Sequence, residues 1–174
     1  MSSKIVLILG YGQRIGAAVA RAFASRGYKV AVVCRSDKVA DTPDDYLSIK
    51  ADLSNAYNVE DVFTQVRSKL GIPSVVVYNE PLISMGMGKS ASAHMIHYLS
   101  EVYRSSGYKF YHTDERESNG EPAYDKLDAE AHSNYYVELA EGKDQGPWNA
   151  TFVKGKGYVK FDETPIHGGR FPGA

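Results

Sequence analysis

The 174-residue chain has a hydrophobic content of 43%, a charged content of 24% and a formal net charge of −1 at pH 7. These values are typical of one soluble globular domain, and they exclude a disordered or fibrous chain. With so little net charge, the chain offers no overall attraction for a nucleic acid or an anionic membrane surface, and neither is expected as a partner.

Apolar runs alternate with amphipathic stretches along the chain. The apolar runs predict strands over residues 4–9, 29–34, 46–51, 74–79, 108–112 and 150–161. The amphipathic stretches predict helices over residues 13–25, 54–70, 89–105 and 126–141. This alternation indicates an α/β fold with a doubly wound, mostly parallel sheet of about six strands and helices on both faces. We expect a single domain over residues 1–161, followed by a flexible Gly/Pro-rich tail over residues 162–174.

The location of the protein is indicated by its cysteine content and its first apolar run. Cys34 is the only cysteine, so no intramolecular disulfide can form and a reducing compartment is expected. The run at residues 4–9 is too short for a signal-peptide core and far below the ~20 residues of a membrane span. We therefore expect a cytoplasmic protein, with Cys34 packed in the core.

A glycine cluster, LGYGQRIGAA, connects the first predicted strand to the first predicted helix at residues 9–18. In a strand–glycine–helix turn, the first glycine permits a tight turn, the second lets the backbone approach a pyrophosphate, and the third lets the helix pack on the strand. Gly10, Gly12 and Gly16 fit these three roles. The free amides at the start of the helix, backed by the helix dipole, would face the phosphates of a dinucleotide.

Two arginines favour NADP over NAD as that dinucleotide. Sites for NAD place an acidic residue at the end of the second strand, where it bonds the ribose 2′-hydroxyl, whereas NADP sites place an arginine nearby. Here Arg35 follows the strand directly, and Arg14 lies within the glycine turn. Both guanidinium groups could converge on a 2′-phosphate. Asp37 could also reach a ribose hydroxyl, so NAD is the alternative cofactor.

These motifs resemble the short-chain dehydrogenase/reductase family, and together they indicate a Rossmann-like fold. The resemblance rests on LGYGQRIG, on Arg35, on Asp52-Leu53 after the third strand and on Tyr78-Asn79 after the fourth. It implies that Asp52 and Leu53 lie along the adenine and that Asn79 supports the cofactor and the central strand. The predicted cofactor-binding residues are Gly10, Gly12, Arg14, Ile15, Gly16, Arg35, Asp52, Leu53, Asn79 and Lys89.

The catalytic half of the family pattern is incomplete. GMGKSASAHMI resembles the helix that carries the family's Tyr-x-x-x-Lys motif, in which the lysine contacts the nicotinamide ribose and lowers the pKa of the tyrosine. Lys89 matches the lysine, but Met85 stands where the tyrosine is expected. Only residues 80–88 separate Asn79 from Lys89, so the long helix and the serine-bearing strand of the family are missing. The chain is therefore interpreted as internally shortened.

An internal deletion has consequences for the sheet and for assembly. The helix at residues 89–105 would still connect two parallel strands, so the strand at residues 108–112 is expected to move beside the strand at residues 74–79. The resulting order would be 3-2-1-4-5-6. Because the resemblance places the deleted helix and the lysine helix at the family's subunit interface, we expect a homo-oligomer with an altered interface.

Other side chains could replace the missing proton donor. His112 and Asp114 fall near the end of a predicted strand, where ligands of open α/β sheets bind, so either is a candidate general acid or base. Together with Lys89 they form the predicted catalytic set. Polar residues at strand ends also commonly cap helices or form hydrogen bonds with the backbone of loops. His94 and His97 lack a third ligand, and no metal site is predicted.

Three functional hypotheses follow. The first is an oxidoreductase-derived protein that binds NADP(H) and acts on an unknown small molecule without the usual Ser-Tyr-Lys relay. The second is a cofactor-independent isomerase, dehydratase or cyclase, whose apolar pocket would use Met85, Met87 and Met95, unless these methionines only fill the core. The third is a non-catalytic, nucleotide-sensing or partner subunit.

Overall fold

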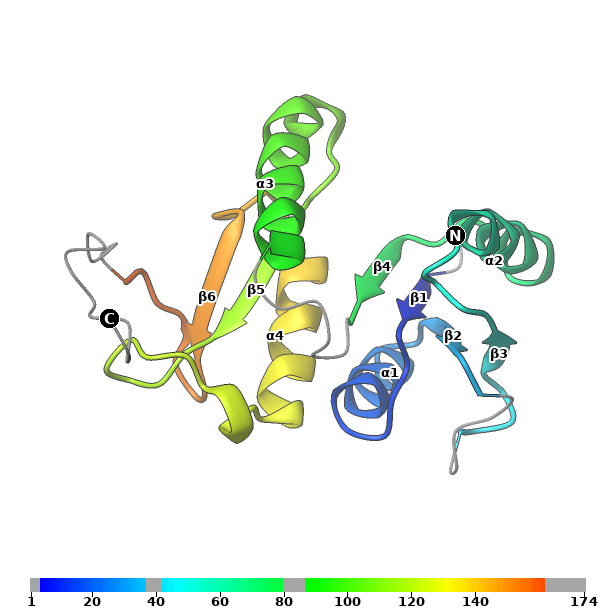
Figure 1. The fold of residues 1–174 in the computed structure, drawn as a ribbon, viewed down its shortest axis with the longest axis horizontal. Coiled ribbons are helices and arrows are strands. Elements are labelled where there is room, and N and C mark those ends of the chain that lie inside the picture. Colours follow the sequence, from blue (N-terminus) through cyan, green and yellow to red (C-terminus); the bar gives the residue numbers. More distant parts are fainter. Residues whose placement is uncertain (1–3, 37–41, 80–86, 162–174) are drawn as a thin grey trace.

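The computed structural model describes residues 4–36, 42–79 and 87–161. Four parallel strands form the first sheet, in the order β3-β2-β1-β4 (Figure 1). They are β1 (Ile5–Leu9), β2 (Lys29–Cys34), β3 (Leu47–Lys50) and β4 (Val75–Tyr78). The core strands β1 and β2 are almost wholly buried, as expected for continuous aliphatic runs in a sheet that is covered on both faces. Cys34 is buried at the end of β2, as predicted.

Two helices cover opposite faces of this sheet. Helix α1 (Ile15–Ser25) packs on the face that carries Val6 and Ile8 of β1, through Val19, Ala20 and Phe23. Helix α2 (Ala56–Lys69) packs through Val62 and Val66 on the opposite face, together with the alternate residues of β1. The period of two in the strands therefore sends successive side chains to two separate cores. The predicted α/β class, with helices on both faces, is confirmed.

The second half of the chain forms a separate three-stranded sheet, in the order β5-β6-β7. Its strands are β5 (His112–Glu115), β6 (Asn149–Val153) and β7 (Gly157–Tyr158), with β5 and β6 parallel and β7 antiparallel. Helix α3 (Met87–Val102) and the short helices η1 (Arg104–Ser106) and η2 (Tyr124–Lys126) flank it, together with helix α4 (Ala129–Glu141). None of the helices in the described ranges is long and apolar enough to span a membrane.

Helix α4 joins the two halves. It lies against α1 (Figure 1), and its Val137 belongs to the same apolar core as α1. Its Tyr135 ring stacks on Phe152 of β6 with ring centroids 4.5 Å apart. At the outer end of α4, Glu141 forms ion pairs with Lys4 and Arg26. Helix α4 thus packs on α1, which covers the first sheet, and on β6 of the second sheet.

The predicted single sheet of order 3-2-1-4-5-6 is wrong, because β5 pairs with β6 and not with β4. The predicted strand at residues 108–112 is also displaced, since β5 begins only at His112. The physical reason is visible at Phe110, whose backbone N–H and C=O both bond the side-chain amide of Gln145. A side chain thus takes the place of a strand on the side of Phe110 that faces the second sheet, and the parallel pairing with β6 starts only at His112.

Candidate functional site

The glycine turn begins with a backbone conformation that only glycine adopts without strain. Gly10 has φ +82°, and a Cβ at this position would lie 2.2 Å from the carbonyl oxygen of Asn79. Asn79 is held in place because its N–H donates to Leu9 O (2.9 Å) and its Nδ2 donates to Gly10 O (3.2 Å). The Tyr11 amide donates to Val33 O (2.8 Å), which ties the turn to β2. Residues from three strands therefore shape this turn.

The other two glycines of the turn differ in their surroundings. A Cβ on Gly16 would lie 3.1 Å from Tyr11 Cα, so this glycine lets α1 start directly against the turn. A Cβ on Gly12 would meet nothing within 4 Å, so its backbone faces open space. Within the described chain, the first α1 amide with an acceptor is that of Ala17, on Gly12 O (2.9 Å). The amides of Ile15 and Gly16 precede it, where a helix offers free N–H groups and the positive end of its dipole.

Two further predicted residues, Arg35 and Asp52, lie together at the ends of β2 and β3. Both are exposed, and the Ala51 amide binds Cys34 O (3.0 Å), which brings the two strand ends side by side. The pKa of Asp52 is lowered, first by the backbone N–H of Ser54 that its carboxylate accepts (3.0 Å) and to a smaller extent by the charge of Arg35. Leu53 is half-buried against the α2 core. This corner combines a guanidinium group, a carboxylate and an apolar side chain.

Arg14 and Lys89 have different surroundings. Arg14 is exposed, and its Nη2 donates to Leu127 O (3.3 Å) in the segment that leads into α4. Lys89 belongs to the first turn of α3, but the position of its side chain lies outside the described part of the structure. Met85, the residue at the expected tyrosine position, also lies outside the described residues.

The structure places His112 and Asp114 on β5, in the second sheet. Asp114 is engaged by Arg116, whose Nη2 and Nε lie 2.6 and 2.7 Å from Asp114 Oδ2. The backbone N–H of His112 donates to Trp148 O (2.8 Å). No described hydrogen bond or ion pair connects either residue to the glycine turn, whereas Gly10, Gly16 and Asn79 are brought together there.

The sequence reasoning missed a buried polar pair, Glu115 of β5 and His132 of α4. Their exposed side-chain fractions are 4% and 8%, and His132 Nε2 lies 3.1 Å from Glu115 Oε2 without the alignment of a hydrogen bond. Burial lowers the pKa of His132 to about 4, and burial also raises the pKa of Glu115. The same Glu115 oxygen accepts the Asp128 amide (2.8 Å) at the start of α4. No periodicity in the sequence distinguishes these residues from ordinary surface charges.

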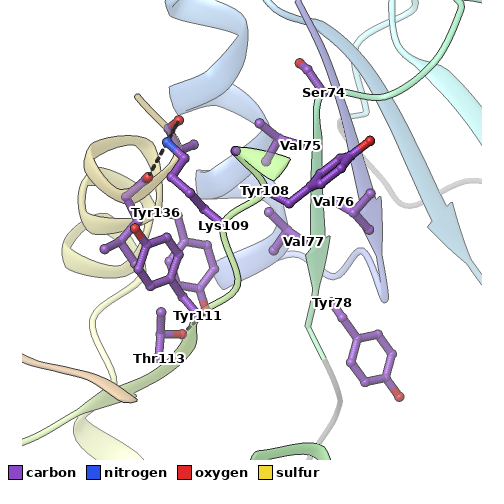
Figure 2. A pocket seen from close by; sticks show the side chains of 13 residues that line it. Ser74, Val75, Val76, Val77, Tyr78, Tyr108, Lys109, Tyr111, Thr113 and Tyr136 are labelled. Carbon is purple, nitrogen blue, oxygen red and sulfur yellow. Dashed lines mark hydrogen bonds between the residues drawn. The ribbon is translucent and has the colours of Figure 1, made fainter. Parts of the chain in front are cut away.

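A second feature not found from the sequence is a pocket of about 270 Å³ beside β4. Residues 74–78 form one wall, and residues 107–113 and α4 form the others (Figure 2). In the described part of the chain, no cluster of three or more His, Cys, Asp or Glu side chains could hold a metal ion.

Comparison with known proteins gives matches over most of the chain. Residues 4–102 match the family model described as short chain dehydrogenase. A curated relative, "Short chain dehydrogenase/reductase dmxR12" of Cryptosporiopsis sp. (strain 8999), is 34% identical over 238 aligned positions that cover 92% of this chain and 96% of the relative. This alignment exceeds the 174 residues of the chain by 64 positions, so at least that many positions of the relative have no counterpart here. Because the coverage of both chains is nearly complete, the shortening is internal, as predicted.

Solved structures of low sequence identity share the fold. A short-chain type dehydrogenase/reductase from Mycobacterium marinum is 15% identical, with a TM-score of 0.69 over 88% of this chain and 95% of that one. A doubly substituted short-chain dehydrogenase/reductase from Serratia marcescens is 13% identical, with a TM-score of 0.63 over 87% of this chain and 97% of that one. The glycine turn, the parallel sheet and these matches together show that the chain is an internally shortened member of the short-chain dehydrogenase/reductase family.

Proposed function

We propose that the protein binds NADP(H) at the glycine turn and acts on a small molecule without the usual Ser-Tyr-Lys proton relay. The observation that carries this proposal is the division of roles among three glycines: Gly10 against Asn79, Gly16 against Tyr11, and Gly12 facing open space. Such a surface accepts a pyrophosphate because backbone N–H groups can approach it closely, with the positive end of the α1 dipole behind them.

The choice of NADP rests on Arg35. Its exposed side chain follows β2, at the corner where Asp52 and Leu53 would accompany the adenosine. A guanidinium group binds a phosphate through charge-assisted, often bidentate hydrogen bonds. Arg35 would therefore hold the 2′-phosphate, while the amides of Ile15 and Gly16 hold the pyrophosphate.

The proposed reaction needs both a hydride and a proton. A bound nicotinamide cofactor donates or accepts a hydride, and carbonyl reduction also requires a proton at the substrate oxygen. Methionine has no exchangeable proton, so Met85 cannot supply it. Lys89, His112 and Asp114 are the residues proposed to take part in this proton transfer. Of the three, only Lys89 matches a residue of the family's Ser-Tyr-Lys relay.

Calorimetric titration with NADPH and NADH tests the nucleotide proposal. We expect the wild-type protein to bind NADPH more tightly than NADH, and Arg35→Glu to weaken NADPH binding by at least about tenfold, because a charge-assisted hydrogen bond contributes roughly 1.5–3 kcal/mol. Binding of NADH should change much less. Arg67→Glu is the matched control, since Arg67 is an exposed arginine in the last turn of α2.

Three results, two from this titration and one from an added activity assay with carbonyl substrates, distinguish the hypotheses. Equal loss of NADPH binding in both variants would mean that net charge, not Arg35, sets the affinity. Absence of binding to either nucleotide would contradict the proposal and favour the cofactor-independent catalyst. Tight binding without turnover of any carbonyl substrate tested would favour the nucleotide-sensing subunit.

We also propose that the protein forms a homo-oligomer through α3. Three large apolar side chains, Met95, Tyr98 and Val102, are exposed at spacings that place them on one helical face. We expect Tyr98→Glu combined with Val102→Glu to convert the oligomer to a monomer in light scattering coupled to size exclusion. Tyr57→Glu, on the exposed surface of α2, should leave the mass unchanged. A wild-type protein that elutes as a monomer would contradict this proposal.

A further inference from the structure

The pocket beside β4 is a slot between two chain segments that run in the same direction. Ser74 and Lys109 lie at one end of it, and Tyr78 and Thr113 lie towards the other (Figure 2). Tyr136, Leu139 and Ala140 of α4 line the slot on one side. In the described chain β4 pairs only with β1, so the edge of the first sheet faces this slot.

The backbone of β4 presents hydrogen-bonding groups to the slot. In a parallel pair, alternate residues of a strand bond the same neighbour. The Asn79 amide donates to Leu9 O of β1, so Val75 and Val77 share that orientation towards β1. The N–H and C=O of Val76 therefore point away from β1, into the slot.

The opposite wall is arranged in the same way. The backbone of Phe110 bonds Gln145, and the N–H of His112 bonds Trp148 O, so these two residues face the second sheet. Lys109 and Tyr111 alternate with them and face the slot. Among the described residues, no acceptor is found for the backbone N–H of either one. In the part of the chain that the structure describes, unpaired backbone N–H groups thus face the slot from both walls, that of Val76 from one side and those of Lys109 and Tyr111 from the other.

The dimensions and chemistry of the slot restrict its occupant. Five residues of β4 and its approach line the slot, which corresponds to about 16 Å at ~3.3 Å per residue. Among the described residues that line the slot, Lys109 is the one with a charged side chain, and its ammonium group already binds the carbonyl oxygens of Leu139, Ala140 and Gly142 at the end of α4. An uncharged occupant with an apolar side towards α4 fits this lining.

We propose that the slot binds an extended, uncharged peptide segment of a partner protein, which adds a strand between β4 and residues 107–113. Main-chain pairing on both sides gives the affinity, and an apolar side chain against Tyr136, Leu139 and Ala140 gives the selectivity. The chain lacks at least 64 positions of its relative dmxR12, which is far more than the length of one β-strand. This site is separate from nucleotide binding and does not depend on it.

The test uses a fluorescein-labelled, seven-residue peptide of alternating valine and threonine, blocked at both ends. We expect saturable binding by fluorescence polarisation, together with at least tenfold slower hydrogen exchange at the amides of Val76, Lys109 and Tyr111. The same peptide with N-methyl groups on alternate residues should bind at least tenfold more weakly. It keeps the side chains but loses the donors to one wall.

Val76→Pro is the matching change in the protein. Proline removes the Val76 N–H, which β1 does not use, and prolines are tolerated at sheet edges. We expect this variant to fold and to lose peptide binding, whereas Val76→Thr, which keeps the N–H, should retain it. Should Val76→Pro fail to fold, the N-methylated peptide still provides the comparison with wild-type protein.

Two results would overturn the proposal. Equal binding of the normal and N-methylated peptides would show that the slot recognises side chains, as a small-molecule pocket does. Absence of peptide binding, with the Val76, Lys109 and Tyr111 amides already protected in the free protein, would show that the chain itself closes the slot. Because the titration with NADPH is read independently, failure here leaves the nucleotide proposal unaffected.

Discussion

Replacing Gly10 by alanine is expected to lower the free energy of unfolding by about 3 kcal/mol or more, against roughly 1–2 kcal/mol for Gly27→Ala. Both glycines have nearly the same positive φ, +82° and +79°. The added Cβ at Gly27 meets nothing within 4 Å, whereas the one at Gly10 lies 2.2 Å from Asn79 O. Gly27→Ala therefore measures the backbone strain, and the difference between the two variants measures the clash.

Urea unfolding followed by circular dichroism checks this prediction. Asn79 cannot move away from a Cβ at position 10 without breaking hydrogen bonds, because it is bonded to both Leu9 and Gly10. Gly12→Ala is the functional control: its Cβ meets nothing within 4 Å, so stability should change little while nucleotide binding weakens. Equal destabilisation by Gly10→Ala and Gly27→Ala would show that the contact with Asn79 does not constrain the turn.

The buried His132 makes the stability of the fold depend on pH. Its pKa is about 4 in the folded protein, below the ordinary value of 6.5, because burial disfavours the charged imidazolium. Between these two values the unfolded chain binds more protons than the folded one. The contribution of His132 is therefore complete above pH 6.5 and is lost as the pH falls towards 4, by about 3 kcal/mol in total.

Denaturant midpoints measured from pH 7.5 down to pH 4.5 test this contribution. We expect His132→Gln to be less stable than the wild type at pH 7.5 but to lose less stability on acidification. Glu115, whose pKa is raised, acts with the opposite sign: its contribution falls as the pH rises through its own range. It is present in both proteins but lies 3.1 Å from His132, so the difference between the two slopes reports His132 together with its effect on Glu115. His94→Gln, at an exposed position, should keep the wild-type slope. Parallel slopes for wild type and His132→Gln would contradict the assignment.

The family and the glycine turn can be predicted from local sequence. The burial of consecutive residues in β1 and β2 follows from continuous aliphatic runs, and a glycine directly after a strand signals a tight turn. The helix predicted at residues 126–141 begins only at Ala129, where the Asp128 side chain caps it by accepting the Ala131 amide. The sequence indicated these elements because the formation of each depends on residues that are only a few positions apart.

By itself, then, the sequence determined the α/β class, the glycine turn, the position of Arg35 after its strand and the absence of a tyrosine four residues before Lys89. Only the tertiary structure decided that β5 pairs with β6, that Gln145 replaces a strand beside Phe110, and that a slot separates β4 from residues 107–113. It alone also brought Glu115 to His132. The reason is physical: strand order and buried polar pairs depend on α4 packing on α1 and β6 together, and these partners are distant in sequence.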